Sequence, residues 1–201
     1  MSTLAKMFSS AVLVTVLGLV PWPAAAAGSR IESGSVAFLS QEKHVNLEFD
    51  CSEMRIGRKL KTAVPVPEFV AQLNQKRGGS GDGWKMEWIG STNQFQLKFQ
   101  ELLNKQVGAG GGPLEFGAFK DAKYTLILKT TTLLTGSAGF AATPPRLFAD
   151  AVFVETSNRT NPLAVIQLKD LPGVGMWEFD MREAYAKAGK ELGALLRKKI
   201  K

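Results

Sequence analysis

Cysteine and histidine are almost absent from this chain, which contains one of each, Cys51 and His44, in 201 residues. A lone cysteine cannot form an internal disulfide, so the stability of the fold must come from its core. One histidine and one thiol also remove most metal, thiol and serine–histidine chemistry before any motif is considered. The sequence therefore says more about location and fold than about activity.

A long hydrophobic run is missing as well. The apolar stretch Met7–Val20 is about 14 residues long and ends at Pro21, whereas a helix needs ~20 residues to span a bilayer. Lys6 precedes this stretch and four alanines, 24–27, follow it. This three-part layout is typical of a secretory signal peptide.

We expect cleavage just before Ala27 or Gly28, where small residues occupy the recognition positions. The predicted organisation is a signal peptide over residues 1–27 and a single domain over residues 28–201. No cysteine stands at the cleavage site, which argues against a lipid anchor. The mature protein is expected to be exported, periplasmic or extracellular, with no transmembrane anchor after cleavage.

Acidic residues are fewer than basic ones, 18 against 25, which gives a net charge of +7. Cations in the last turn of a helix complement its dipole, which is one explanation of the C-terminal cluster. Attraction to an anionic membrane surface or wall polymer is the other. An exported chain rarely meets nucleic acid, so no nucleic-acid partner is expected. The two basic clusters are Arg197, Lys198, Lys199 and Lys201, and Arg55, Arg58, Lys59 and Lys61.

Residue patterns predict an α+β fold. Strict alternation over His44–Cys51 indicates a half-buried strand, and the glycine-rich run Gly78–Gly83 is expected to be a flexible loop. In the last helix, Tyr185, Leu192 and Leu196 share one apolar stripe and should be buried against the sheet. The predicted elements are strands 34–39 and 44–51 as a hairpin, helices from Pro65 to Gln75 and from Ser91 to Lys105, strands 123–134, 149–156 and 163–169, and a helix over 180–199.

The order is thus β-β-α-α-β-β-β-α, which predicts helices packed on a mainly antiparallel sheet. The three C-terminal strands should form a meander, because turn-forming residues separate the second strand from the third.

Four residues near the first strands are candidates for a catalytic or metal-binding role. His44 and Cys51 lie seven residues apart, which places them on opposite faces and roughly 23 Å apart on a strand, too far for a dyad. Glu48 and Asp50 share one face at a spacing of ~7 Å, which leaves a carboxylate hydrolase open. His44 with these two carboxylates could form only a weak metal site.

Other motifs carry little chemistry. The glycine runs lack the Gly-Lys-Ser/Thr ending of a phosphate loop, and Gly136–Gly139 lacks the spacing of a nucleophile elbow. Asn158–Thr160 is a glycosylation sequon that matters only in a secreting eukaryote. The sequence therefore assigns no catalytic, cofactor-binding or metal-binding residue, and no cofactor.

Two stretches carry a resemblance: Ser33–Val36 with Val45–Asp50, and Ala184–Leu192. They resemble uncharacterised small exported bacterial proteins of the Bacteroidetes type and, more distantly, the periplasmic α/β domains of lipoproteins that activate penicillin-binding proteins. The resemblance implies an envelope location and offers no catalytic residue. The chain departs from the activator group in lacking a lipobox cysteine.

These observations favour an exported cell-envelope protein that is a non-enzymatic partner-binding or structural module. The expected partner is another envelope protein or an anionic envelope component. The alternatives are a binder or carrier of a small or lipidic ligand and a carboxylate-dependent hydrolase.

Overall fold

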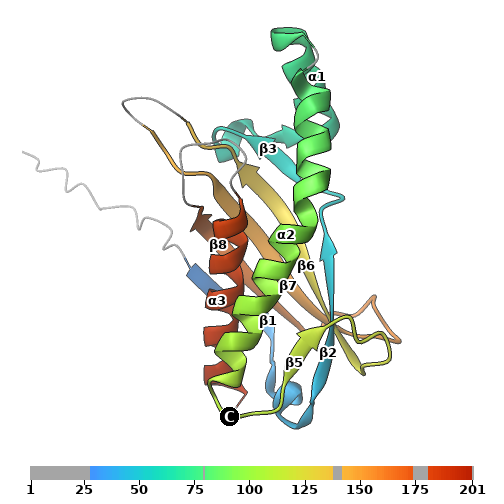
Figure 1. The fold of residues 1–201 in the computed structure, drawn as a ribbon. Coiled ribbons are helices and arrows are strands. Elements are labelled where there is room, and N and C mark those ends of the chain that lie inside the picture. Colours follow the sequence, from blue (N-terminus) through green and yellow to red (C-terminus); the bar gives the residue numbers. More distant parts are fainter. Residues whose placement is uncertain (1–27, 79, 138–141, 174–180, 201) are drawn as a thin grey trace, which may run out of the picture.

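The computed structural model describes residues 28–78, 80–137, 142–173 and 181–200 (Figure 1). The expected signal peptide, residues 1–27, lies outside this part of the chain. The elements are β1 (Gly28–Gly34), β2 (His44–Asp50), β3 (Arg55–Gly57), β4 (Val64–Pro65), α1 (Val66–Arg77), α2 (Ser80–Gly108), β5 (Glu115–Gly117), β6 (Tyr124–Leu134), β7 (Arg146–Glu155), β8 (Ala164–Pro172) and α3 (Arg182–Lys199), with short 3-10 turns at Ala37–Gln41 and Leu60–Thr62.

The strands form one sheet in the order β1-β8-β7-β6-β2-β5, and β3 joins β6 beyond the end of β2. The meander of β6, β7 and β8 is antiparallel, as predicted. In contrast, β2 runs parallel to both β5 and β6, and β3 also runs parallel to β6. The fold is therefore α+β, and the sheet is mixed and not purely antiparallel. The reason is that α1 and α2 form a long crossover between β2 and β6, and such a crossover returns the chain in the same direction.

The predicted strand over 34–39 and its hairpin with β2 are wrong. Strand β1 ends at Gly34, and Ala37–Gln41 is a 3-10 turn. At Gly34 the backbone has φ 73°, and a Cβ there would overlap the carbonyl group of Leu163. The chain turns away at this glycine, and β1 pairs with β8 instead of β2.

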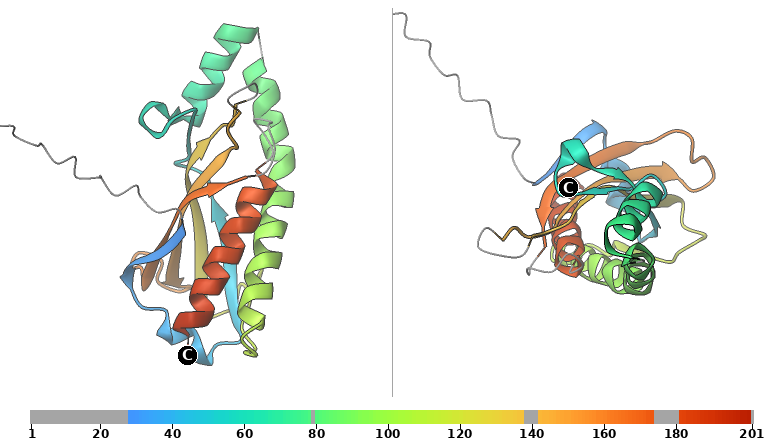
Figure 2. Two further views of the ribbon diagram at one scale, coloured as in Figure 1. Left: turned by 90° about the vertical axis from the view of Figure 1, so that its left-hand side faces the viewer. Right: turned by 90° about the horizontal axis from the view of Figure 1, so that it is seen from above.

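Helices α2 and α3 lie side by side on one face of the sheet (Figure 2). The α3 stripe was predicted correctly, because Tyr185, Leu192 and Leu196 are all buried. They face a core made of the inward side chains of the strands. Its fully buried members include Leu126, Leu128, Leu147, Phe153, Ile166 and Leu168.

The expected loop at Gly78–Gly83 is wrong beyond its first residues, because α2 already begins at Ser80. The backbone N–H of Gly81 donates to Asn74 Oδ1 at 2.8 Å. A Cβ at Gly81 would overlap the Val70 carbonyl group of α1. Glycine therefore serves here as a close contact between α1 and α2, which together extend past the end of the sheet (Figures 1 and 2). The predicted start at Ser91 falls inside this continuous helix.

The opposite face of the sheet carries a row of polar side chains. Strand register places this transverse row across β1, β8, β7, β6 and β2, next to the half-buried apolar row of Val165, Val152 and Ile127. Charges along the polar row alternate in sign, which suits a face that none of the described helices covers (Figure 2). The row consists of Arg30, Gln167, Asp150, Lys129 and Asp50.

Candidate functional site

His44 and Cys51 have different surroundings at opposite ends of β2. His44 is exposed, and its ring centroid lies 4.4 Å from that of Phe119. Cys51 is half-buried and packs against the core. Burial raises the pKa of the Cys51 thiol, an effect that hydrogen bonds with Thr130 and Tyr185 partly oppose. Cys51 thus contributes a half-buried thiol at the edge of the core.

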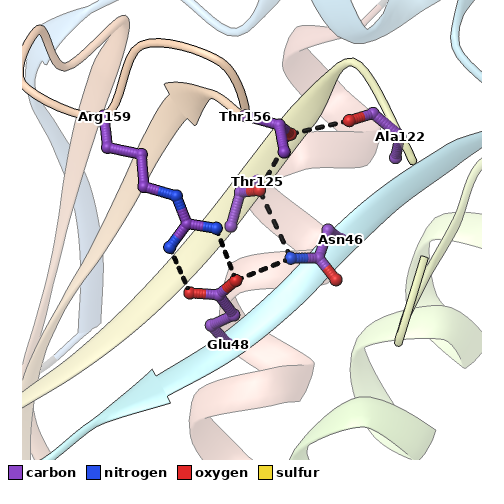
Figure 3. A network of polar contacts seen from close by, with 6 residues as sticks. All are labelled: Asn46, Glu48, Ala122, Thr125, Thr156 and Arg159. Carbon is purple, nitrogen blue, oxygen red and sulfur yellow. Dashed lines mark hydrogen bonds and ion pairs between the residues drawn. The ribbon is translucent and has the colours of Figure 1, made fainter. Parts of the chain in front are cut away.

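Glu48 is held in a two-point ion pair with Arg159, from the loop between β7 and β8 (Figure 3). Arg159 Nη1 donates to Glu48 Oε2 at 2.8 Å, and Nη2 donates to Oε1 at 2.7 Å. Asn46 Nδ2 donates to the same Oε1 at 2.9 Å. This arrangement clamps a loop 111 residues away in sequence onto β2.

A chain of hydrogen bonds continues from Asn46 away from Glu48 (Figure 3). Asn46 Nδ2 donates to Thr125 Oγ1 at 3.3 Å, and the hydroxyl groups of Thr125 and Thr156 lie 2.9 Å apart. Thr156 Oγ1 donates to the carbonyl oxygen of Ala122 at 2.6 Å. Because Thr156 uses its proton on Ala122, the Thr125 hydroxyl donates to Thr156 and accepts from Asn46. This chain satisfies the buried Asn46 and joins three segments.

These contacts do not equip the carboxylates for acid catalysis. The hydrogen bond from Arg159 lowers the pKa of Glu48, and hydrogen bonds from Ser52 lower the pKa of Asp50. A glycosidase acid instead needs a raised pKa so that it holds a proton near neutral pH. Glu48 and Asp50, which were predicted to share a strand face, therefore each hold a different neighbouring segment in place.

Metal-ligating side chains do not cluster in the described part of the chain. Within residues 28–78, 80–137, 142–173 and 181–200, no three Cys, His, Asp or Glu side chains gather closely enough to hold a metal ion. The hypothetical site of His44, Glu48 and Asp50 is not assembled, since each carboxylate has its own partner. Asn158 is exposed in the same loop as Arg159 and accepts a hydrogen bond from Thr160 Oγ1 at 2.8 Å.

A hollow of about 880 Å³ lies where β6 ends, β7 begins and β8 ends, beside the 3-10 turn Leu60–Thr62. We call it the basic hollow. Half-buried or exposed apolar side chains contribute to its lining, and Leu60 is 54% exposed. Its lining consists of Arg58, Lys59, Leu60, Lys61, Leu134, Thr135, Ser137, Thr143, Pro144, Arg146, Phe148, Lys169 and Asp170.

The charges of the basic hollow are unbalanced. Five lining residues are basic and one, Asp170, is acidic. Arg146 Nη1 donates to both carboxylate oxygens of Asp170, at 2.6 and 2.7 Å. The other four basic residues form no ion pair with any residue in the part of the chain that the structure describes. Their charge is therefore available to an anion.

The backbone at Asp170 is strained. Asp170 has φ 58°, the one positive value among described residues other than glycine. The pairing register between β7 and β8 also shifts beside Asp170, between Leu147 and Ala149 of β7. A left-handed conformation costs about 1 kcal/mol or more in a residue that has a Cβ, and bulges often redirect side chains at functional sites. Here the distortion directs the carboxylate onto Arg146.

The basic cluster near residue 58 divides in the structure. Arg58, Lys59 and Lys61 line the basic hollow, whereas Arg55 donates to the carbonyl oxygen of Ala63 at 2.6 Å. Reasoning from the sequence found this cluster but missed the half contributed by β7 and β8. One signal was present: Arg146, Phe148 and Asp150 share the outward parity of β7, and a phenylalanine is unusual on a polar face.

Comparison with known proteins gives no family. No family model and no curated protein matches the chain. Among solved structures, the dodecamer of PelC from Paraburkholderia phytofirmans matches with a TM-score of 0.40 and 10% identity, over 84% of this chain and 96% of that one. A variant of the same PelC gives 0.39 and 11%, over 86% and 99%. No helix in the described part of the chain has the length and apolar content to cross a membrane.

Proposed function

We propose that this chain is an exported, non-enzymatic cell-envelope protein that binds an anionic amphiphile of the envelope in the basic hollow. The observation that carries the proposal is the coincidence of four unpaired basic side chains with an apolar surface in one concavity of about 880 Å³. Concave sites of ~300–1,000 Å³ with a few placed polar groups are typical of small-ligand binding.

The two parts of the lining favour the two parts of such a ligand. An acyl chain would cover Leu60, Leu134 and Phe148, and burying apolar surface contributes ~25 cal/mol per Å². A phosphate or carboxylate head would meet Lys59 and Lys61, which stand on either side of Leu60. A wholly polar polyanion would leave the apolar residues in water, so an amphiphile fits better.

The residues of the basic hollow favour an anionic amphiphile over a protein partner and over a hydrolase function. A protein partner would need an apolar surface without the excess of four cations, because charged residues are depleted at interface cores. The two carboxylates that the sequence offered to a hydrolase, Glu48 and Asp50, are each held by hydrogen bonds that lower their pKa. An anionic envelope component therefore remains the proposed partner.

Calorimetric titration tests the ligand class. The purified protein is titrated with dodecyl phosphate below its micelle concentration, with inorganic phosphate, and with dodecyl maltoside. Dodecyl phosphate should bind at least tenfold more tightly than either control, because it alone has both a negatively charged head and an alkyl chain. Equal binding of dodecyl phosphate and dodecyl maltoside would contradict the role of the cations, and equal binding of phosphate would contradict the role of the apolar surface.

The envelope location is part of the same proposal. It is supported by the signal-like layout of residues 1–27 in the sequence. N-terminal sequencing of the protein recovered from its native host should start at Ala27 or Gly28. An intact Met1 would contradict export by this signal.

A further inference from the structure

Strand β1 forms one edge of the sheet. Its register with β8 runs from Gly28 opposite Lys169 to Gly34 opposite Ala164. No other strand in the described residues pairs with it. Ser29 Oγ also donates to the carbonyl oxygen of Glu191 in α3, at 3.4 Å, which anchors the strand. One side of a fixed seven-residue strand therefore offers unpaired backbone groups, which is a template for another strand.

The sequence of β1 is self-complementary about Ile31. The residue before Ile31 is Arg30, and the residue after it is Glu32, which carries the opposite charge. The match ends there, because the β-bulge between Ile31 and Ser33 places Ser29 opposite the buried Leu168 and Ser33 opposite Val165, on the other face. In an antiparallel pair of identical strands centred on Ile31, Arg30 of each copy faces Glu32 of the other. The whole strand is Gly28-Ser29-Arg30-Ile31-Glu32-Ser33-Gly34.

The two charged residues lie close together and exposed on each copy. Arg30 Nη2 and Glu32 Oε2 lie 2.8 Å apart, and their side chains are 64% and 44% exposed. Glu32 is the extra residue of a β-bulge, so no β8 residue is opposite it in the register. Arg30 also donates from Nε and Nη2 to Gln167 Oε1 of β8, at 3.3 and 3.1 Å, so its guanidinium lies on the open face of the sheet. An ion pair across the edge would replace the exposed pair within each copy. Opposite charges directly across an antiparallel pair stabilise it, and like charges destabilise it.

We propose that two copies of this chain join edge to edge through β1, antiparallel and centred on Ile31, into one continuous sheet. In this arrangement Arg30 of each copy faces Glu32 of the other, and the contact is symmetric because the same strand serves on both sides. The proposal does not depend on the ligand of the basic hollow, which is lined by other elements.

Charge reversal tests the arrangement through the mass of the purified protein in sedimentation equilibrium. The natural chain should approach twice its monomer mass as concentration rises. Arg30→Glu and Glu32→Arg should each weaken the dimer at least tenfold, because like charges then face each other. An equimolar mixture of the two variants should return to within threefold of the natural affinity, since the variants are complementary to one another. The double variant Arg30→Glu with Glu32→Arg should also regain it.

The control variants Glu101→Arg and Lys105→Glu make the same charge changes on the exposed side of α2 and should leave the dimer unchanged. A natural chain that stays monomeric at the highest concentration would overturn the proposal. Single variants that dimerise as well as the natural chain would overturn it too, and so would a mixture that remains monomeric.

Discussion

Cys51 shows how its surroundings decide the chemistry of a residue. Its thiol lies next to the hydroxyl groups of Thr130 and Tyr185, which are themselves 2.8 Å apart. Burial raises the pKa of the thiol, and it also raises the pKa of Tyr185 above its usual range. Because the thiolate is the reactive form, the only thiol of the chain is poorly nucleophilic at neutral pH.

We therefore expect iodoacetamide to alkylate Cys51 at pH 8 at least ~10-fold more slowly in the folded protein than in urea. Mass spectrometry of timed samples measures both rates on the same residue, so the unfolded chain is its own control. Equal rates would show that the thiol is exposed and ionised.

The ion pair of Glu48 and Arg159 predicts a pH dependence. The pKa of Glu48 is lower in the folded protein than in the unfolded chain, chiefly because of the hydrogen bond from Arg159. The stabilisation is therefore complete above the unfolded pKa and is lost as pH falls through the folded pKa. Glu48→Gln should lower the free energy of unfolding at pH 7 and flatten its decline between about pH 5 and pH 3.

Urea unfolding at several pH values measures this effect, with Glu87→Gln on the exposed side of α2 as a matched control. The same acid dependence in both variants would contradict a stabilising ion pair between Glu48 and Arg159.

Among the elements, α2 and α3 depend on close contact. A Cβ at Gly189 would overlap the Phe99 carbonyl group, and one at Gly193 would lie 2.6 Å from Gln106 Cβ. Such glycines let the two helix backbones approach each other. At Gly90, on the exposed part of α2, a Cβ would meet nothing within 4 Å.

Two alanine substitutions should therefore have opposite effects. Gly189→Ala should destabilise the protein by about 1–3 kcal/mol, because steric overlap in a packed seam exceeds the gain in helix propensity. Gly90→Ala should stabilise it by up to ~1 kcal/mol, because only the propensity changes. Urea denaturation measures both values. A stabilising Gly189→Ala would mean that the helices are packed less tightly than the structure shows.

The same elements show what the sequence could reveal. The stripe of α3 and the strands of the C-terminal meander were predictable, because periodicity reports burial within one element. The pairing of β1 with β8 was not, since no local pattern encodes a partner more than a hundred residues away. Gly81 was misread because a glycine in a close contact and a glycine in a loop look alike in sequence. Only half of the candidate site could be predicted. The basic cluster at Arg58 is evident in the sequence, whereas no sequence pattern indicates a role for Asp170.

In the whole molecule, the two faces of the sheet have different roles. Helices cover one face and complete the core (Figure 2), while the other carries a row of alternating charges and ends at the basic hollow. The net charge of +7 would attract any anion from a distance, and salt would screen that attraction. The proposed site is more specific, because the cations of the basic hollow, and not the overall charge of the protein, would bind the anion.

The most direct test compares two variants with the same change in net charge. Lys59→Glu with Lys61→Glu reverses two cations of the basic hollow, whereas Lys198→Glu with Lys199→Glu reverses two exposed cations at the end of α3. Calorimetric titration with dodecyl phosphate should show at least a ~10-fold weaker affinity for the first variant, equivalent to about 1.4 kcal/mol, and a change within about threefold for the second. Equal losses in both variants, or no loss in the first, would contradict a ligand site in the basic hollow.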